Sequence, residues 1–216
     1  MCPFCYIGKR RIEEALGQFP HNDEIEIEWK SFQLNPDAKT DPSKSVNQYL
    51  AEQKGISEFQ AKQLNDRVTQ TAKEAGLQYD FDKAIVANSF DAHRLSHLAK
   101  KHGMQNEMEE RLFKAYFTEG KNTADHDTLI QLAVEVGLDR DEVRTMLSGS
   151  DFADAVTKDI YEAQQVGARG VPFFIFNDSY AVSGAQPGKL FLQVLEQSYA
   201  QWKNTAVQQR KTEREK

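Results

Sequence analysis

Two cysteines at the start of the chain, Cys2 and Cys5, are the residues best suited to covalent chemistry. They are separated by Pro3 and Phe4, and they are the only cysteines among the 216 residues. A Cys-x-x-Cys spacing places two sulfur atoms on one turn of backbone, close enough to form a disulfide with each other. At the beginning of a helix, the first sulfur also faces free backbone N–H groups and the positive end of the helix dipole. Such surroundings lower a cysteine pKa from about 8.5 and predict a reactive thiolate at Cys2.

The residues that follow this pair are typical of a helix. Apolar and charged side chains recur at helical spacing from Ile7 to Leu16, and Gly17 marks a favourable end. Pro3 is tolerated in a first helical turn, where its missing N–H is not needed. We therefore expect the two cysteines to open a helix.

Composition and charge narrow the class of protein. The chain is 39% hydrophobic with a formal net charge of −6, and its length fits one elaborated domain or a core domain with a large insertion. An acidic chain lacks the basic face that a nucleic-acid partner requires. A run of about 18 apolar residues is missing from the sequence, and the start at the cysteine motif predicts no secretion signal. We expect a cytoplasmic protein without a membrane or nucleic-acid partner, whose two cysteines serve catalysis rather than structure.

The hydrophobic pattern separates strands from helices along the chain. Residues 24–34 alternate charged and apolar side chains, which predicts a strand. Residues 45–166 have helical periodicity almost throughout. Strand patterns return at 171–176 and 180–183 as a hairpin, and an amphipathic helix follows at 186–202.

Single residues sharpen these predictions. Ser57, Asp125 and Asp139 are expected to cap three helices of the long helical block. The apolar strand over residues 171–176 is expected to be buried on both faces and to contribute three aromatic residues to the core. These are Phe173, Phe174 and Phe176.

The order of elements predicts an α/β, thioredoxin-like fold with a large all-helical insertion. In such folds a proline after a cis peptide bond lies against the active-site cysteines, and Pro172 occupies the corresponding strand start. A trans proline at a strand edge is the alternative explanation. We expect a thioredoxin-like core in two parts, residues 1–40 and 168–204, with a helical insertion subdomain of residues 41–167 between them. A solvated tail of residues 205–216 follows and contains the basic residues Arg210, Lys211, Arg214 and Lys216.

Three segments together resemble a known family. They are residues 2–9 (CPFCYIGK), 88–95 (NSFDAHRL) and 170–174 (GVPFF). Their types and order resemble the DsbA-like thioredoxin-fold proteins of the FrnE branch, which are thiol–disulfide oxidoreductases. The resemblance extends from Cys2 to about Trp202. A sister branch, the 2-hydroxychromene-2-carboxylate isomerases, uses glutathione and typically has serine where Cys2 stands, so the two cysteines favour redox chemistry.

The resemblance implies roles for individual residues. Cys2 would be the nucleophilic cysteine and Cys5 the resolving one. Val171 and Pro172 would form the cis-proline dipeptide that shapes the substrate groove.

Pro3 and Phe4, between the cysteines, would tune the redox behaviour. Phe4 could equally form an exposed platform for hydrophobic substrates.

The sequence departs from this family at its start. Family members begin with a central strand that leads into the cysteine motif, whereas Met1 directly precedes Cys2 here. We therefore expect the first strand to be missing from this chain, through a shortened start or a strand supplied by a partner. An unpaired neighbour strand would carry a cost in stability.

Two further residues of the second segment are candidates for the site. Asn88 is expected either to cap the following helix or to contribute to the groove. His93 could accept a proton or contact substrate, or it could be an ordinary helix histidine. His93, His97 and both cysteines would add up to the four ligands of a zinc site. A second cysteine pair is absent, however, and no metal is expected.

The leading hypothesis is thiol–disulfide exchange of the isomerase type, with protein or small thiol and disulfide substrates. No bound cofactor is expected, glutathione could serve as a redox co-substrate, and a homodimer is compatible with the sequence. A glutathione-dependent isomerase or transferase acting on a small aromatic or polyketide-like substrate is the alternative. A chaperone or binding module that uses an apolar groove is a third hypothesis.

Overall fold

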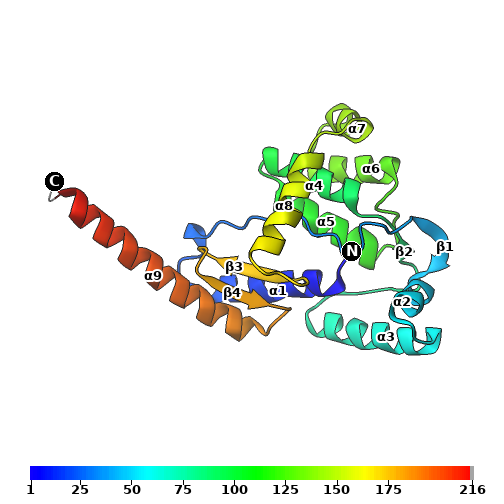
Figure 1. Cartoon of the computed structure of the whole chain (residues 1–216), viewed down its shortest axis with the longest axis horizontal. Coiled ribbons are helices and arrows are strands. Elements are labelled where there is room, and N and C mark those ends of the chain that lie inside the picture. The colour runs from blue at the N-terminus through cyan, green and yellow to red at the C-terminus, as the bar shows by residue number, and fades with distance from the viewer. Residues whose placement is uncertain (215–216) are drawn as a thin grey trace.

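A computed structural model gives the backbone of residues 1–214 and side chains through residue 205. The cysteine helix, the block of helices, the hairpin and the terminal helix follow the predicted order, with α1 starting directly after Cys2 (Figure 1). In chain order they are α1 (Pro3–Gln18), the 3₁₀ turn η1 (Asn22–Glu24), β1 (Asp41–Ser45), α2 (Val46–Lys54), α3 (Glu58–Glu74), β2 (Ile85–Val86), α4 (Phe90–Lys101), α5 (Gln105–Phe117), α6 (His126–Val136), α7 (Arg140–Ser148), α8 (Ala153–Gln165), β3 (Phe173–Phe176), β4 (Tyr180–Ser183) and α9 (Gly188–Arg214).

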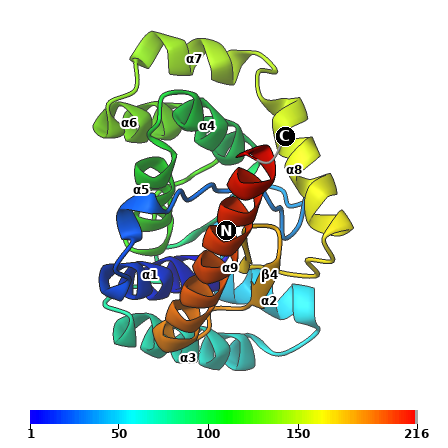
Figure 2. The same cartoon turned by 90° about the vertical axis from the view of Figure 1, so that its left-hand side faces the viewer.

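The molecule is built in layers. Helices α4 to α8 form a block on one side of α1, and the β3–β4 hairpin and α9 lie beside α1 (Figure 1). Figure 2 shows the layers from the side. From top to bottom they are α7, then α6 and α4, then α5, then α1, and last α3. The far end of α9 extends away from the body of the molecule (Figure 1). Helix α1 therefore lies where the block of helices meets the hairpin and α9.

Three apolar clusters hold these layers together. One fills the block of helices around Leu95, Leu112 and Leu129, which are buried completely or nearly so. A second lies between α1, β4 and α9. The third is rich in aromatic rings and joins α1, α5 and the segment after α3; its buried aromatic residues are Tyr6, Tyr79, Phe81, Phe113, Tyr116 and Phe117.

The helix ends that the sequence predicted from capping residues are confirmed. The Ser57 hydroxyl accepts from the backbone N–H of Gln60 at 3.2 Å, and the Gln60 side chain bonds back to the N–H of Ser57. Asp125 and Asp139 cap α6 and α7 through their carboxylates. These side chains satisfy N–H groups that the first turn of a helix leaves free.

The predicted strand over residues 24–34 is wrong. Within residues 1–214 the strand ladders are β1–β2 and β3–β4, and residues 25–34 join neither. Alternation alone does not make a strand, because a strand needs a hydrogen-bonding neighbour. Side chains of helices bond this segment instead: Gln105 bonds both the N–H and the carbonyl of Trp29 at 3.1 Å, and Asp159 accepts from the N–H of Ser31 at 2.8 Å.

The expectation that strand 171–176 is buried on both faces is also wrong. β3 has one strand partner, β4, and Ile175 is 45% exposed. Phe173, Phe174 and Phe176 are only half-buried. Phe174 packs edge-on against Phe191 of α9, with ring centroids 4.6 Å apart.

The terminal helix is longer than predicted, because α9 runs to Arg214. The side chains of residues 206–216, which include the basic residues of the expected tail, lie outside the described residues. Of the helices that the structure describes, none has the length and apolar character needed to cross a membrane.

Candidate functional site

Cys2 stands at the N-cap position of α1, and Cys5 lies in the first turn. The backbone of Cys2 is extended, and the N–H of Cys5 bonds to the Cys2 carbonyl at 3.2 Å. Pro3 occupies the start of the helix, as the sequence predicted. Both thiols are free rather than joined in a disulfide. The geometry is that of a cysteine pair at a helix N-terminus.

The surroundings of Cys2 stabilise its thiolate. The pKa of Cys2 is lowered to about 7, chiefly by a hydrogen bond from the Cys5 side chain. Burial opposes this shift, while the backbone N–H groups of Cys5 and Phe4 add to it. A cysteine with this pKa is about half ionised at neutral pH.

The carbonyl of Val171 lies next to the Cys2 sulfur. The Cys2 Sγ is 3.4 Å from the Val171 oxygen, although the two residues are 169 positions apart. The Val171–Pro172 peptide bond is cis, as the sequence resemblance implies. The structure therefore brings together the cysteine motif and the Val-Pro dipeptide that the sequence singled out.

Gly8 allows α1 to approach this dipeptide closely. A Cβ atom on Gly8 would lie 3.0 Å from the Phe174 ring and 3.3 Å from Pro172 Cγ. Such contacts are tight, so a side chain here would push α1 and β3 apart. Sequence reasoning missed this role, which only the packing reveals.

Cys5 has surroundings of the opposite kind. Its pKa is raised well above the ordinary value, first by its hydrogen bond to Cys2 and then by burial. The negative charges of Cys2 and Glu109 raise it further. Cys5 therefore stays protonated where Cys2 ionises.

Tyr79 is a second site residue that the sequence did not indicate. Its hydroxyl donates to the Pro3 carbonyl at 2.7 Å, between the two cysteines, and its ring stacks on Phe117 at 4.7 Å. Burial raises the pKa of Tyr79, and so do the charges of Tyr6 and Cys2. Tyr79 thus ties the first turn of α1 to the aromatic cluster.

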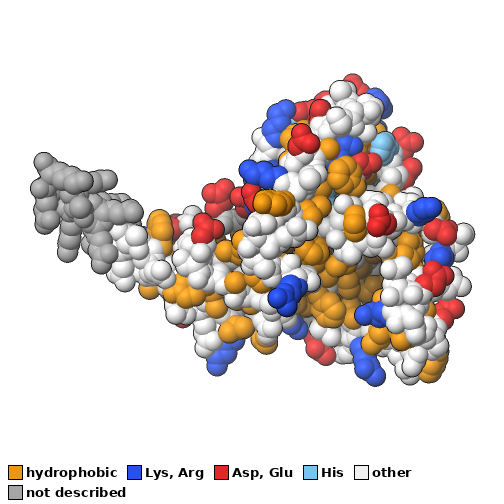
Figure 3. Space-filling view, viewed as in Figure 1, with side chains coloured by type: hydrophobic (Ala, Val, Ile, Leu, Met, Phe, Trp, Pro, Cys, Tyr) orange, Lys and Arg blue, Asp and Glu red, His pale blue; other side chains and the backbone are white. Residues whose placement is uncertain are grey.

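An apolar hollow lies beside the chain start. Hydrophobic side chains gather there, between the start of α1 and the α2–α3 helices (Figure 3). Phe4, in the first turn of α1, is 42% exposed, and half-buried apolar residues pack on the aromatic cluster. They include Met1, Cys5, Val46, Ala87 and Ala185.

Asn88 bonds mainly to backbone. Its side-chain nitrogen donates to the carbonyls of Pro36 at 3.1 Å and Ala38 at 3.0 Å, and its oxygen accepts from the N–H of Phe90 at 2.9 Å. It therefore holds the 36–38 loop and the first turn of α4. A role in a substrate groove remains a prediction.

His93 lies near the chain start. Burial and, after it, the positive charge of the Met1 α-amino group lower its pKa to about 4. His93 is therefore neutral at physiological pH. His97, one turn later, bonds to Asp159 at 3.0 Å and to Ser31 at 3.1 Å. Its Nε2 atom makes both contacts, which is not the arrangement of a Ser-His-Asp triad.

A charged cluster fastens α1 to α5. Glu110 accepts from Arg10 at 2.5 Å and lies 2.9 Å from the Lys9 ammonium. The Tyr6 hydroxyl donates to Glu110 at 2.5 Å, and Lys9 also pairs with Glu13. Burial alone would raise the pKa of Glu110, but its bonds to Arg10, Tyr6 and Lys9 lower it to about 2.

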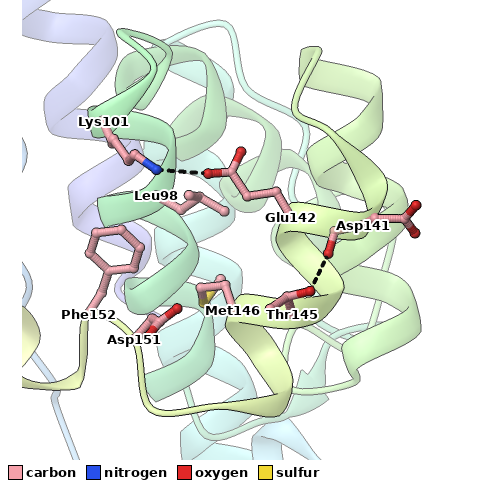
Figure 4. Close-up of a pocket in the computed structure, with 8 residues that line it drawn as sticks. All are labelled: Leu98, Lys101, Asp141, Glu142, Thr145, Met146, Asp151 and Phe152. Carbon is pink, nitrogen blue, oxygen red and sulfur yellow. Dashed lines mark hydrogen bonds and ion pairs between the residues drawn. The ribbon is translucent and has the colours of Figure 1, made fainter.

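A pocket of about 580 Å³ lies away from the cysteines, between α4, α7 and the loop before α8 (Figure 4). Its wall carries an ion pair between Lys101 and Glu142 at 3.0 Å. Phe152 and Leu98 form part of its apolar side. Neither Cys2 nor Cys5 is among the residues that line it.

Comparisons with known proteins agree with this geometry. A sequence profile of the DSBA-like thioredoxin domain matches residues 1–208. The uncharacterized protein YwbO of Bacillus subtilis (strain 168) is 30% identical over 201 residues, which cover 88% of this chain and 89% of YwbO. The crystal structure of the probable DsbA oxidoreductase SCO1869 from Streptomyces coelicolor is 39% identical, with a TM-score of 0.86, covering 92% of this chain and 86% of that one.

A more distant structure shares the fold. It is that of a 2-hydroxychromene-2-carboxylate isomerase, 13% identical with a TM-score of 0.64, covering 95% of this chain and 94% of that one. Together these similarities confirm the thioredoxin-like fold, interrupted by helices, that the sequence predicts.

Proposed function

We propose that this chain, which belongs to the DsbA-like thioredoxin domain family, exchanges protein disulfides through Cys2 and Cys5. The observation that carries the proposal is the contrast between the two thiols. The pKa of Cys2 is lowered to about 7, whereas that of Cys5 is raised. Cys2 is thus partly ionised and able to attack a disulfide, whereas Cys5 stays protonated as a thiol.

The exchange proceeds in two steps. The Cys2 thiolate attacks one sulfur of a substrate disulfide, forms a mixed disulfide and releases the other sulfur as a thiolate. Cys5 then loses its proton and attacks the Cys2 sulfur, so that the Cys2–Cys5 disulfide forms and the second substrate sulfur leaves as a thiolate. The substrate gains two electrons and the protein loses two. Isomerisation results when a thiol of the substrate itself breaks the mixed disulfide.

Surface features around Cys2 support a substrate with apolar character. Phe4 is 42% exposed, and the apolar hollow opens beside the start of α1 (Figure 3). The backbone of Val171 next to the Cys2 sulfur can bond an extended peptide in the manner of an added strand. Protein disulfides therefore fit this site, and low-molecular-weight disulfides fit it too.

The proposal also covers the compartment, the co-substrate and the partners of the reaction. A reducing cytoplasm would favour disulfide reduction or isomerisation, with glutathione as redox co-substrate and no bound cofactor. The acidic charge of −6 favours neither nucleic-acid nor membrane partners. We also propose that a homodimer is compatible with this activity.

An alternative function is a glutathione-dependent isomerase or transferase. It is favoured by the shared fold with the 2-hydroxychromene-2-carboxylate isomerase. The presence of both cysteines argues against it, since isomerisation of a small aromatic substrate needs no second thiol.

Reduction of a disulfide-bonded peptide in glutathione buffer tests the proposal. We expect the wild type to turn over, Cys2→Ser to be inactive, and Cys5→Ser to accumulate a mixed disulfide visible by mass spectrometry. Full exchange activity in Cys2→Ser would refute the mechanism. Glutathione-dependent conversion of an aromatic substrate that survives Cys5→Ser would favour the alternative.

A further inference from the structure

The hydroxyl of Tyr79 reaches the backbone between the two cysteines. It donates to the Pro3 carbonyl at 2.7 Å, although the two residues are 76 positions apart. The Pro3 carbonyl and the Phe4 N–H belong to one planar peptide group, in which the C=O and the N–H point in opposite directions. A donor bonded to this carbonyl therefore fixes the plane of the peptide group and, with it, the direction of the Phe4 N–H.

The Phe4 N–H is one of the groups that act on Cys2. Cys2 occupies the N-cap position of α1, and the first N–H groups of a helix have no backbone partner within it. The N–H groups of Phe4 and Cys5 both favour the Cys2 thiolate. A hydrogen bond to the carbonyl of a peptide group also polarises its N–H and makes it a stronger donor. The Tyr79 hydroxyl and the Cys2 sulfur thus act on the same peptide group.

The chain on both sides of Tyr79 is bonded to the end of α5. The Gln78 carbonyl accepts from the Thr118 hydroxyl at 2.7 Å. The Asp80 N–H donates to the Phe117 carbonyl, also at 2.7 Å. The backbone of Tyr79 is therefore fixed relative to α5 by one hydrogen bond from each neighbour in the sequence.

Aromatic packing fixes the ring of Tyr79 as well. The residue is 8% exposed, and its ring stacks on Phe117 with centroids 4.7 Å apart. Phe81 packs edge-on against the ring at 5.7 Å. Burial raises the pKa of Tyr79, so the hydroxyl keeps its proton at neutral pH and remains a donor. A phenylalanine would fill the same space, so packing alone does not account for the hydroxyl.

We propose that Tyr79 is a positioning residue for Cys2. Through the Pro3 carbonyl it orients and polarises the peptide group whose N–H favours the attacking thiolate. This inference rests on the proposed function. The Tyr79 hydroxyl keeps its proton throughout, and the bonds that form and break are those of the thiol–disulfide exchange.

Other groups also face the two side chains. The Cys5 thiol, the α-amino group of Met1 and the Val171 carbonyl act on or contact Cys2. The charges of both cysteines, Tyr6 and Arg10 act on Tyr79. Replacement of Tyr79 by phenylalanine leaves all of these groups in the protein, so it isolates the contribution of one hydroxyl.

The pH profile of Cys2 alkylation by iodoacetamide tests the proposal in the reduced full-length protein. In Tyr79→Phe we expect the midpoint to move to higher pH, so that the thiolate fraction at pH 6 falls by about threefold. The rate on the high-pH plateau should stay within about twofold of the wild type, because the sulfur remains equally accessible. Mass spectrometry identifies Cys2 as the alkylated residue.

Tyr116→Phe is the matched control. Tyr116 is buried in the same aromatic cluster, and no hydrogen bond joins its hydroxyl to α1 within the described residues. This variant should keep the wild-type midpoint. An unchanged midpoint in Tyr79→Phe would overturn the inference. An equal shift in Tyr116→Phe would also overturn it, since any lost hydroxyl of the cluster would then have the same effect.

Fluorotyrosine in place of Tyr79 tests the same contact without removing the hydroxyl. Fluorine makes the hydroxyl a stronger donor, so the midpoint should move to lower pH. A midpoint that stays in place or moves to higher pH would contradict the inference even if Tyr79→Phe fails to fold. A wild-type protein that shows the expected alkylation profile but does not reduce a disulfide-bonded peptide would instead refute the proposed function.

Discussion

Cys2 and Cys5 are both largely buried, but the hydrogen bonds and charges around them shift their pKa values in opposite directions. Cys2 sits at the end of α1, where backbone N–H groups and the Cys5 thiol lower its pKa to about 7. Cys5 lies in the first turn, where its hydrogen bond to Cys2, burial and negative charge raise its pKa. One helical turn therefore separates an attacking thiolate from a protected thiol. The difference arises first from the hydrogen bond between the two thiols, which favours the thiolate form of Cys2 and the thiol form of Cys5, and then from the backbone N–H groups at the start of α1, which favour the Cys2 thiolate.

The largest expected effect comes from removing one member of the pair at a time. Cys2→Ser should lower the exchange rate by more than about a thousandfold, because no other thiolate is available to attack. Cys5→Ser should retain the first attack and lose only resolution. Stopped-flow measurement of both steps distinguishes these outcomes, and equal loss in the two variants would mean that the thiols do not have separate roles.

The next effect concerns the hydrogen bond between the thiols. Cys5→Ala removes the largest contribution to the lowered pKa of Cys2, so the pKa should rise and the thiolate fraction at pH 7 should fall by about tenfold. The rate of Cys2 alkylation by iodoacetamide as a function of pH measures this shift.

Cys5→Ser is the control for that measurement. A serine hydroxyl still donates a hydrogen bond, so the pKa of Cys2 should move less than in Cys5→Ala. Identical pH profiles in the two variants would show that burial or the backbone, rather than the Cys5 side chain, sets the pKa.

A smaller effect is expected on the side of α1 that faces α5. Glu110→Gln should lower the free energy of unfolding by about 2 kcal/mol at pH 7, because Lys9 and Arg10 lose a partly buried partner. The pKa of Glu110 is lowered to about 2 in the folded protein. Its stabilisation is therefore present at neutral pH and is lost as pH falls below about 4.5 toward 2.

Urea denaturation at pH 7 and at pH 3 checks this sign. The stability difference between wild type and Glu110→Gln should shrink at the lower pH. A difference that grows on acidification would contradict the assigned ion pairs.

The smallest effect is expected at an exposed ion pair. Lys62 and Asp66 are one turn apart on α3, 2.8 Å from each other and largely in solvent. Lys62→Gln should leave the free energy of unfolding nearly unchanged, as measured by urea denaturation. A larger loss would mean that surface charge contributes to this fold as much as the α1–α5 cluster does.

Features that depend on neighbouring residues in the sequence could be predicted. The caps at Ser57, Asp125 and Asp139 follow from a side chain and backbone groups two or three positions away. The placement of Cys2 at a helix start follows from Pro3 and the helical pattern after it. Local signals of this kind survive folding because no distant segment has to arrive for them to form.

Features that depend on a distant segment were either missed or predicted wrongly. The alternation over residues 24–34 has the period of a strand, but side chains of α5 and α8 bond its backbone instead. The Tyr79 hydroxyl reaches the cysteine helix from a segment more than 70 residues away. Val171 and Pro172 were found only because the predicted fold and the family resemblance pointed to them. Periodicity carries no information about which helix face meets α1.

The most direct test of a working redox pair is a titration of thiols against glutathione buffers of graded potential. At each potential, free thiols are alkylated and counted by mass spectrometry. We predict a single two-electron transition in which Cys2 and Cys5 lose their free thiols together as one intramolecular disulfide forms. Two thiols that stay free at every potential, or a mixed disulfide with glutathione that Cys5 never resolves, would contradict the account.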